Sequence, residues 1–315
     1  TDAGHYTDST AQSSQKDCPA GTYQPDTGQT SCDDTDAGHY TDSTAQSSQK
    51  DCPAGTYQPD AGQTSCDDAD AGYYVEDNSY TEIIYDSTQI TTGFFYTCAI
   101  LDDGSISCWG QNGNGQLGDG NNNDQYTPTQ TSSLGTGRTA VAITAGAYHT
   151  CAILDDGSVS CWGYNAFGQL GDGTTTQRNT PTQTASLGTD RTAVAIAAGY
   201  AHTCAVLDDG SVSCWGSNLF GELGDGSTTQ RLTPTQTSSL GSGRTAVAIT
   251  AAYYHTCVIL DDESVSCWGY NGNGRLGDGT TTDRNTPTQT ASLGSGRTAV
   301  AISTDNAHAC VILDD

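Results

Sequence analysis

The sequence predicts an all-β repeat protein in two parts, a short disulfide-rich N-terminal region and a longer C-terminal array of strands. Cysteine, tryptophan and proline recur every 53 residues from about residue 90 onward, whereas residues 1–68 repeat every 34. Within each long unit, short apolar alternations such as TAVAIT are bounded by Gly and Asp, which is typical of strands and turns. Periods of this length indicate stacked supersecondary units.

The amino-acid composition limits the kinds of partner that this protein can bind and the cellular compartment in which it folds. The 315 residues carry a formal net charge of −27, which disfavours nucleic acid and anionic membrane surfaces because both bind through Lys and Arg. No apolar run approaches the roughly 18–20 residues that span a bilayer, so we expect no membrane insertion. The thirteen cysteines include no CxxC pair, and this pattern favours disulfides in an oxidising, extracellular compartment.

The N-terminal repeat indicates its own disulfides. Each 34-residue unit contains two 17-residue half-units, and Cys18 and Cys32 belong to one of them. The equivalent positions of the next half-unit are Thr35 and Gln49, so both cysteines are missing together. This joint absence predicts that the two cysteines of one half-unit pair with each other. The predicted stalk disulfides are Cys18–Cys32 and Cys52–Cys66.

The first long repeat predicts a stapled hairpin. Residues 102–104 (Asp-Asp-Gly) form a three-residue loop in which the glycine supplies a positive φ. Counting outward, Ile100 faces Ile106 and Cys98 faces Cys108 at a non-hydrogen-bonded position, where a disulfide forms readily. Closing this loop stabilises the fold by roughly 2.5–3 kcal/mol in the chain-entropy model. The same spacing predicts Cys151–Cys161, Cys204–Cys214 and Cys257–Cys267.

Two positions depart from the repeat. Glu263 stands where the other turns have glycine, so that turn must be strained or change its type. Cys310 lacks a partner, because the equivalent second cysteine would lie beyond the last residue. With no Met at position 1 either, we expect the sequence to be a processed or truncated piece that ends in mid-repeat.

Two stretches carry a resemblance to known families. The 53-residue unit, AAGYAHTCAVLDDGSVSCWGSNLFGELGDG in its third copy, resembles the repeat of the regulator of chromosome condensation family. The cysteines depart from its intracellular members and resemble secreted prokaryotic versions. The 17-residue unit CPAGTYQPDTGQTSC resembles the Cys-rich repeats of ephrin-type and tumour-necrosis-factor-type receptor ectodomains. These resemblances imply a stalk followed by a β-propeller with four full blades of about 53 residues and part of a fifth.

The predicted organisation follows from the two periods and these resemblances. The stalk occupies residues 1–74 and a junction that fits neither period occupies residues 75–89. The propeller repeats are 90–142, 143–195, 196–248, 249–301 and the partial 302–315.

Recurrent side chains offer a structural and a functional interpretation. The family pattern implies a structural role for His149, His202, His255 and His308, with a metal site as the alternative. Trp109, Trp162, Trp215 and Trp268 are expected to pack between blades, although exposed aromatic rings also stack on sugars. Asp119 and Asp124 are calcium candidates within an oxygen-rich loop, with turn formation as the alternative. The Thr-rich links suit O-glycosylation, with candidates Thr174, Thr175, Thr176, Thr180 and Thr182.

No catalytic pattern is present, since the sequence lacks G-x-S-x-G, H-E-x-x-H and a phosphate-binding loop. We therefore expect a protein that is not an enzyme and needs no cofactor. The near-identical repeats favour an extracellular structural or adhesive protein of a cell-surface layer, appendage or filament, whose main partner is other copies of itself. The alternative is a secreted propeller that recognises a protein or glycan, as an inhibitor or lectin does.

Overall fold

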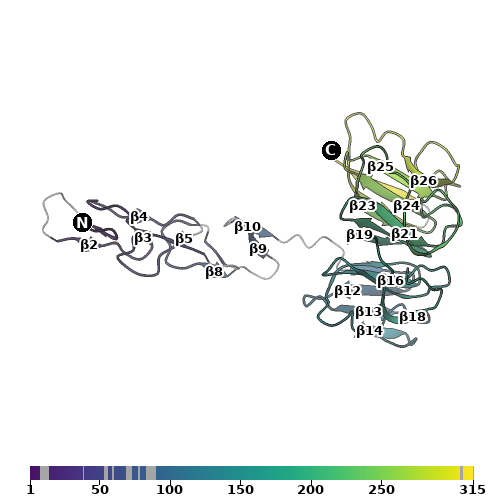
Figure 1. Cartoon of the computed structure of the whole chain (residues 1–315), viewed down its shortest axis with the longest axis horizontal. Coiled ribbons are helices and arrows are strands. Elements are labelled where there is room, and N and C mark those ends of the chain that lie inside the picture. Colours follow the sequence, from purple (N-terminus) through teal and green to yellow (C-terminus); the bar gives the residue numbers. More distant parts are fainter. Residues whose placement is uncertain are drawn as a thin grey trace. The chain divides into compact units, whose positions relative to one another are not determined.

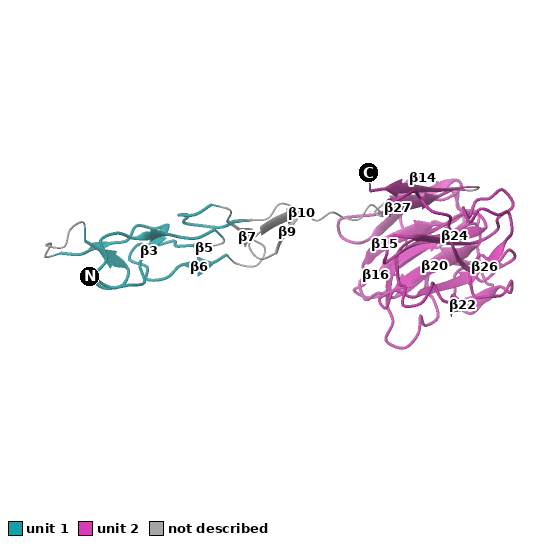
Figure 2. Ribbon diagram, turned by 90° about the horizontal axis from the view of Figure 1, so that it is seen from above, with its two compact units in different colours: residues 1–86 teal, residues 87–315 magenta. Residues whose placement is uncertain are grey.

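A computed structural model describes residues 1–7, 14–37, 39–52, 56–58, 60–68, 73–76, 79–82, 90–305 and 308–314. These residues form strands and turns, and they include no helix that could cross a membrane. Two compact units, Thr1–Asp86 and Ser87–Asp315, are distinguished (Figure 2), and the division falls inside the predicted junction 75–89.

The first unit is a series of short antiparallel pairs. Four pairs of two-residue strands follow one another, and a pair of four-residue strands comes last. The pairs are β1 (His5–Tyr6) with β2 (Lys16–Asp17), β3 (Thr22–Tyr23) with β4 (Asp33–Asp34), β5 (His39–Tyr40) with β6 (Lys50–Asp51), β7 (Thr56–Tyr57) with β8 (Asp67–Asp68), and β9 (Tyr73–Glu76) with β10 (Ser79–Glu82). Strands this short bury little apolar surface, so their loops need further closure.

Covalent and hydrogen-bonded closures alternate along this unit. Disulfides join Cys18 to Cys32 and Cys52 to Cys66. In the half-unit between them, the backbone N–H of Asp36 donates to Gln49 Oε1 at 2.7 Å and Gln49 Nε2 donates to Asp36 Oδ2 at 2.7 Å. Gln49 occupies the position of a missing cysteine, so a two-bond amide clamp closes the loop there.

The second unit consists of four four-stranded antiparallel sheets and one two-stranded sheet, each in sequence order (Figure 1). Blade 1 is β11 (Ile90–Thr92), β12 (Tyr96–Ile100), β13 (Ile106–Gly110) and β14 (Gln125–Gln130). Blade 2 is β15 (Ala140–Ala145), β16 (His149–Leu154), β17 (Val159–Gly163) and β18 (Arg178–Gln183). Blade 3 is β19 (Ala193–Ala198), β20 (His202–Leu207), β21 (Val212–Gly216) and β22 (Arg231–Gln236). Blade 4 is β23 (Ala246–Ala251), β24 (His255–Leu260), β25 (Val265–Gly269) and β26 (Arg284–Gln289), and β27 (Ala299–Thr304) pairs with β28 (Ala309–Leu313). The predicted all-β class with propeller blades is confirmed.

The core lies between neighbouring blades. The second and third strands of blade 2, β16 and β17, are buried along their whole length, whereas its outermost strand β18 is partly exposed. Each apolar cluster combines two blades: Ile100 and Leu117 of blade 1 pack with Leu154 and Trp162 of blade 2. A single blade is therefore too thin to bury its apolar residues without a neighbour.

One hairpin per blade carries a disulfide near its turn. The N–H of Leu101 donates to the carbonyl of Ser105 at 2.8 Å, and Gly104 has φ 73°. Cys98 lies directly opposite Cys108 with their Cα atoms 4.1 Å apart. The blade disulfides are Cys98–Cys108, Cys151–Cys161, Cys204–Cys214 and Cys257–Cys267, and Cys310 is an exposed free thiol.

The turn of blade 4 keeps its type despite Glu263. Glu263 takes φ 63°, and its N–H donates to the Leu260 carbonyl at 2.8 Å, as Gly104 does to Leu101. Of the two sequence-based expectations, the structure therefore shows a left-handed, strained residue in an unchanged turn.

Glu263→Gly is expected to raise the free energy of unfolding by about 0.5–1 kcal/mol, because relief of left-handed strain exceeds the extra chain entropy of glycine. Guanidinium unfolding without reductant measures it. The reverse change, Gly157→Glu, is the matched control and should destabilise more, since a Cβ at Gly157 would lie 2.4 Å from Thr192 Cβ. Equal stability of Glu263→Gly and the wild type would contradict the strain.

Candidate functional site

The two ends of each blade differ in chemistry. In an antiparallel meander, the loops after the first and third strands emerge at one end, and the turn after the second strand emerges at the other. We call these the loop end and the turn end. The turn end is nearly uniform, since each of the four full blades has Asp-Asp followed by Gly or Glu and then Ser. The loop end differs from blade to blade and holds most of the aromatic rings.

Ten aromatic side chains form a continuous cluster at the loop end, which we call the aromatic cluster. Its rings contact one another across blades 1 to 4 at centroid distances of 4.3–6.5 Å. Its members are Phe94, Phe95, Tyr148, Tyr164, Phe167, Tyr200, Phe220, Tyr253, Tyr254 and Tyr270. Phe95 is 68% exposed and Phe167 is 39% exposed, so apolar area at this end remains open to a ligand.

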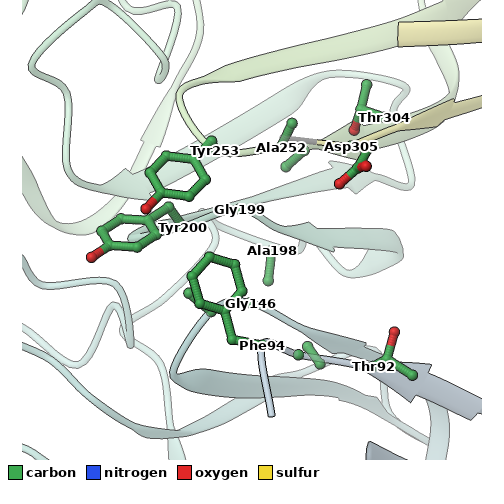
Figure 3. Close-up of a pocket in the computed structure, with 14 residues that line it drawn as sticks. Thr92, Phe94, Gly146, Ala198, Gly199, Tyr200, Ala252, Tyr253, Thr304 and Asp305 are labelled. Atoms are coloured by element: carbon green, nitrogen blue, oxygen red, sulfur yellow. The ribbon is translucent and has the colours of Figure 1, made fainter. Parts of the chain in front are cut away.

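A pocket of about 300 Å³ opens beside the aromatic cluster, where the first strands of successive blades end. Figure 3 shows the rings of Phe94, Tyr200 and Tyr253 toward one side of it, with Thr304 and Asp305 at the other. Tyr200 and Tyr253 stack at 4.3 Å, and Phe94 lies 5.9 Å from Tyr200. The pocket thus joins apolar rings to a few polar groups, a composition typical of ligand sites.

Two of the recurrent histidines, His149 and His202, connect neighbouring blades, whereas the buried His255 has no hydrogen-bond partner on either ring nitrogen and His308 is exposed. His149 Nε2 lies 2.9 Å from Thr203 Oγ1, and that hydroxyl donates to the carbonyl of Gln169 at 2.9 Å. His202 is 3.0 Å from Thr256 Oγ1 in the same way. Because the threonine hydroxyl already donates, it accepts from a neutral imidazole protonated at Nε2. These two histidines therefore act as structural hydrogen bonds between blades.

Burial keeps His149, His202 and His255 neutral. Desolvation lowers the pKa of His149 and of His202 to about 3. Burial, with a smaller contribution from Arg275, lowers the pKa of His255 to about 4. In blade 1, Tyr96 replaces the histidine and its hydroxyl donates to the carbonyl of His149 at 2.5 Å. No group of three or more His, Cys, Asp or Glu that could hold a metal lies within the described ranges.

Three of the four recurrent tryptophans, Trp162, Trp215 and Trp268, are buried in clusters shared by two blades, whereas Trp109 is half-buried. Trp162 is fully buried, and its Nε1 donates to the Gln116 carbonyl of blade 1 at 2.9 Å. Gly118 of blade 1 faces the same indole so closely that a Cβ there would lie 2.7 Å from Nε1. The first glycine of the Leu-Gly-Asp-Gly motif at residues 117–120 is thus required, because a larger side chain would collide with the indole ring of the next blade.

The aspartates of the LGDG turns hold the loop end together. Asp172 accepts from Arg178 Nε at 2.8 Å and from Thr174 Oγ1 at 2.7 Å. Burial raises the pKa of this carboxyl, but the hydrogen bonds from Thr174 and Arg178 outweigh it and lower the pKa overall. Asp225 with Arg231 and Asp278 with Arg284 repeat the pairing.

The calcium candidates of blade 1 are engaged by amides. Asp119 accepts from Asn112 Nδ2 at 3.0 Å and from Gln125 Nε2 at 2.9 Å, and Asp124 accepts from the N–H of Asn112 at 2.8 Å. Gln125 stands where Arg178 stands in blade 2. Both carboxylates therefore have the turn-forming role that the sequence offered as the alternative, and calcium binding stays a prediction.

The O-glycosylation candidates differ in accessibility. Thr175, Thr176 and Thr180 are exposed, whereas the hydroxyl of Thr174 donates to Asp172. Thr182 is half-buried and donates to the carbonyl of Thr180 at 3.1 Å. The exposed three are the sites that a glycosyltransferase could reach, and their modification stays a prediction.

Sequence reasoning missed the aromatic cluster. The loop tips QNGNGQ, YNAFGQ, SNLFGE and YNGNGR differ only modestly when compared one at a time. The available signal was positional: Phe or Tyr occurs at residues 94, 200 and 253 and at 95, 148 and 254, which all precede second strands. Only the stacking of blades brings these rings together.

Family comparisons match both parts of the chain. A family model described as the RCC1-like domain matches residues 86–311. A second, described as tyrosine-protein kinase ephrin type A/B receptor-like, matches residues 4–52. Both resemblances noted in the sequence are thereby confirmed.

Individual proteins resemble about two thirds of this chain. The ultraviolet-B receptor UVR8 of Arabidopsis thaliana is 31% identical over 201 residues, which cover 64% of this chain and 45% of that protein. The probable E3 ubiquitin-protein ligase HERC4 of Homo sapiens is 31% identical over 200 residues, or 63% of this chain and 19% of that protein. This chain thus spans less than half of either relative.

Among solved structures, Prp20p from Saccharomyces cerevisiae has a TM-score of 0.63 at 18% identity, covering 82% of this chain and 60% of that one. Human WBSCR16 has a TM-score of 0.62 at 20% identity, covering 76% and 61%. These similarities concern the fold.

Proposed function

Because this chain belongs to the RCC1-like domain family, we propose that it is an extracellular recognition module whose propeller binds its ligand at the loop end. The six disulfides support an oxidising compartment. The observation that carries the proposal is the gathering of ten aromatic rings where otherwise near-identical repeats diverge. A binding surface needs such local variety, whereas a uniform scaffold does not.

The contrast between the two ends supports a binding role over a catalytic one. The turn end repeats the same Asp-Asp pairs. Arg138 forms an ion pair with Asp156 there, and Arg191 forms one with Asp209. Neither end shows a nucleophile beside a base among the described residues, and the buried His149 and His202 bond threonine hydroxyls. Prp20p, which shares this fold, has binding properties toward Gsp1p and histones, which is consistent with a propeller acting as a binding platform.

The test compares the loop end with the turn end. The unreduced full chain is labelled and applied to an array of extracellular proteins and glycans. A triple variant, Phe95→Ser, Phe167→Ser and Leu219→Ser, removes exposed apolar side chains from the loops of blades 1, 2 and 3 and should lose binding at least tenfold. The matched control, Leu101→Ser, changes a 44% exposed leucine at the turn end and should bind as the wild type does. Unchanged binding by the triple variant would refute the loop end as the ligand surface.

A structural or adhesive role is the second candidate, and the stalk favours it. Successive half-units are joined by backbone hydrogen bonds, such as Gln24 N–H to Gln46 O at 3.1 Å and Thr41 N–H to Gln63 O at 3.3 Å. Units linked in this way can be added without changing their neighbours. Electron microscopy of the native material decides: fibres or a lattice support self-assembly, and discrete particles contradict it.

A further inference from the structure

One blade has a cavity at the loop end that follows from its departures from the repeat. A groove of about 240 Å³ lies over blade 3, between loops of blades 2 and 4. Its walls include Phe167, Tyr200, Leu219 and Tyr254. Leu219 is 69% exposed and stands where the other three blades have Gly or Ala.

Two coincident substitutions account for the space. Ala201 stands where blades 2 and 4 have Tyr148 and Tyr254, and Ser217 stands where they have Tyr164 and Tyr270. Blade 3 therefore lacks two rings that both flanking blades carry at the same places. The rings that remain around the gap are Phe167 of blade 2, Tyr254 of blade 4 and Tyr200 of blade 3 itself, so a hollow with aromatic walls is left at this blade.

The polar groups of the groove are uncharged. Ser217 Oγ donates to the buried Glu222 Oε1 at 2.7 Å, so its lone pairs are free to accept from a ligand. Thr228 and Gln230 are exposed and line the rim with a hydroxyl and an amide. The side chain of Asn218 already makes hydrogen bonds within the loop, where it donates to Asp225 and accepts from the N–H of Leu223.

The charges nearby narrow the class of ligand. Glu222 has no exposed surface, and Ser217 and the N–H of Phe220 occupy its carboxylate. No lining residue is charged, so nothing here would pair with a basic or an acidic anchor. The chain as a whole carries −27 and repels acidic ligands. Flat apolar rings beside neutral donors and acceptors complement a ligand with apolar C–H faces and hydroxyl edges.

We propose that the groove of blade 3 binds a neutral pyranose residue of an extracellular glycan. Tyr200, Tyr254 and Phe167 provide rings against which the sugar face packs, and Leu219 covers one side. The Ser217 oxygen accepts from a sugar hydroxyl, and Thr228 and Gln230 contact the sugar edge. This inference rests on the proposed recognition role of the loop end and names the ligand class and the subsite.

The test fills the groove with residues that neighbouring repeats already use. The probes are neutral oligosaccharides of glucose, mannose, galactose and N-acetylglucosamine, alongside sialylated and sulfated ones, applied to the unreduced full chain. The wild type should retain a neutral oligosaccharide, and the double variant Ala201→Tyr, Ser217→Tyr should weaken that binding at least tenfold. The matched control, Gln111→Tyr, places a tyrosine at the blade 1 position equivalent to Ser217 and should bind as the wild type does.

The outcomes separate this inference from the proposed function. Unchanged oligosaccharide binding by the filled and folded variant overturns the groove. Failure of the wild type to bind any neutral oligosaccharide overturns it also. A wild type that binds a protein ligand, which the triple loop-end variant loses, but binds no neutral oligosaccharide would leave the recognition role standing and overturn the sugar assignment. Circular dichroism and thermal unfolding establish that the filled variant is folded before its binding is compared.

Discussion

Acidification from about pH 7 to about pH 4 is expected to destabilise the second unit by about 3 kcal/mol for each of its three buried histidines. The folded-state pKa is about 3 for His149 and His202 and about 4 for His255, against an ordinary value of 6.5. Between these pH values, the histidines therefore bind protons in the unfolded chain but stay largely unprotonated in the folded chain. The stabilisation is fully present above about pH 6.5 and is lost as the pH falls toward 3.

The first blade supplies the control for this prediction. Tyr96 occupies the histidine position there, and its hydroxyl accepts from Thr150 and donates to the next blade. His202→Tyr should therefore keep the inter-blade hydrogen bonds while removing one titrating group. Guanidinium unfolding at several pH values should show an acid-induced loss about 3 kcal/mol smaller than in the wild type. An identical pH dependence in the two proteins would exclude His202 as a source of the effect.

Trp162→Ala is expected to lower the free energy of unfolding by about 3–5 kcal/mol, because it leaves a cavity between blades 1 and 2. The Gln116 carbonyl that the indole contacts would remain bonded to Thr150 Oγ1, which donates to it at 2.8 Å. The destabilisation therefore comes from lost packing and not from a buried carbonyl left without a hydrogen bond. Denaturant unfolding measures the size, and hydrogen exchange should show faster opening at the interface of these blades.

Trp109→Ala is the matched control for the buried tryptophan. Trp109 occupies the same repeat position in blade 1 but is only half-buried, so less contact is lost when it is truncated. We expect a cost well below that of Trp162→Ala. A cost as large at Trp109 would mean that the ring stabilises its own blade, not the packing of one blade on the next.

Local features of this protein are readable from the sequence because they depend on short-range chemistry. The Asp-Asp-Gly turn and the ten-residue spacing of Cys98 and Cys108 act within one hairpin, where turn geometry sets the register. The unusual Glu263 was likewise identifiable as a strained turn residue without coordinates. The family-level fold followed from motifs that recur in order.

Periodicity determined the length of the repeat but not its phase. The first strand of blade 2 begins at Ala140, three residues before the start of the repeat counted from residue 143. A period is the same wherever the count begins, so only the hydrogen bonds of the sheet decide where a blade starts. The amide clamp of Asp36 and Gln49 was also hidden, because its two residues are recognisable as a pair only once their loop is closed.

Short-range patterns in the sequence specify the strands, the turns and the stapled hairpins of this protein. The gathering of ten rings at the loop end and the groove opened by Ala201 and Ser217 arise from the packing of one blade on the next. The physical reason is distance along the chain: the walls of that groove come from repeats about 53 residues apart. Side chains from neighbouring repeats meet only after each blade has packed against the next, and no local pattern encodes the space between them.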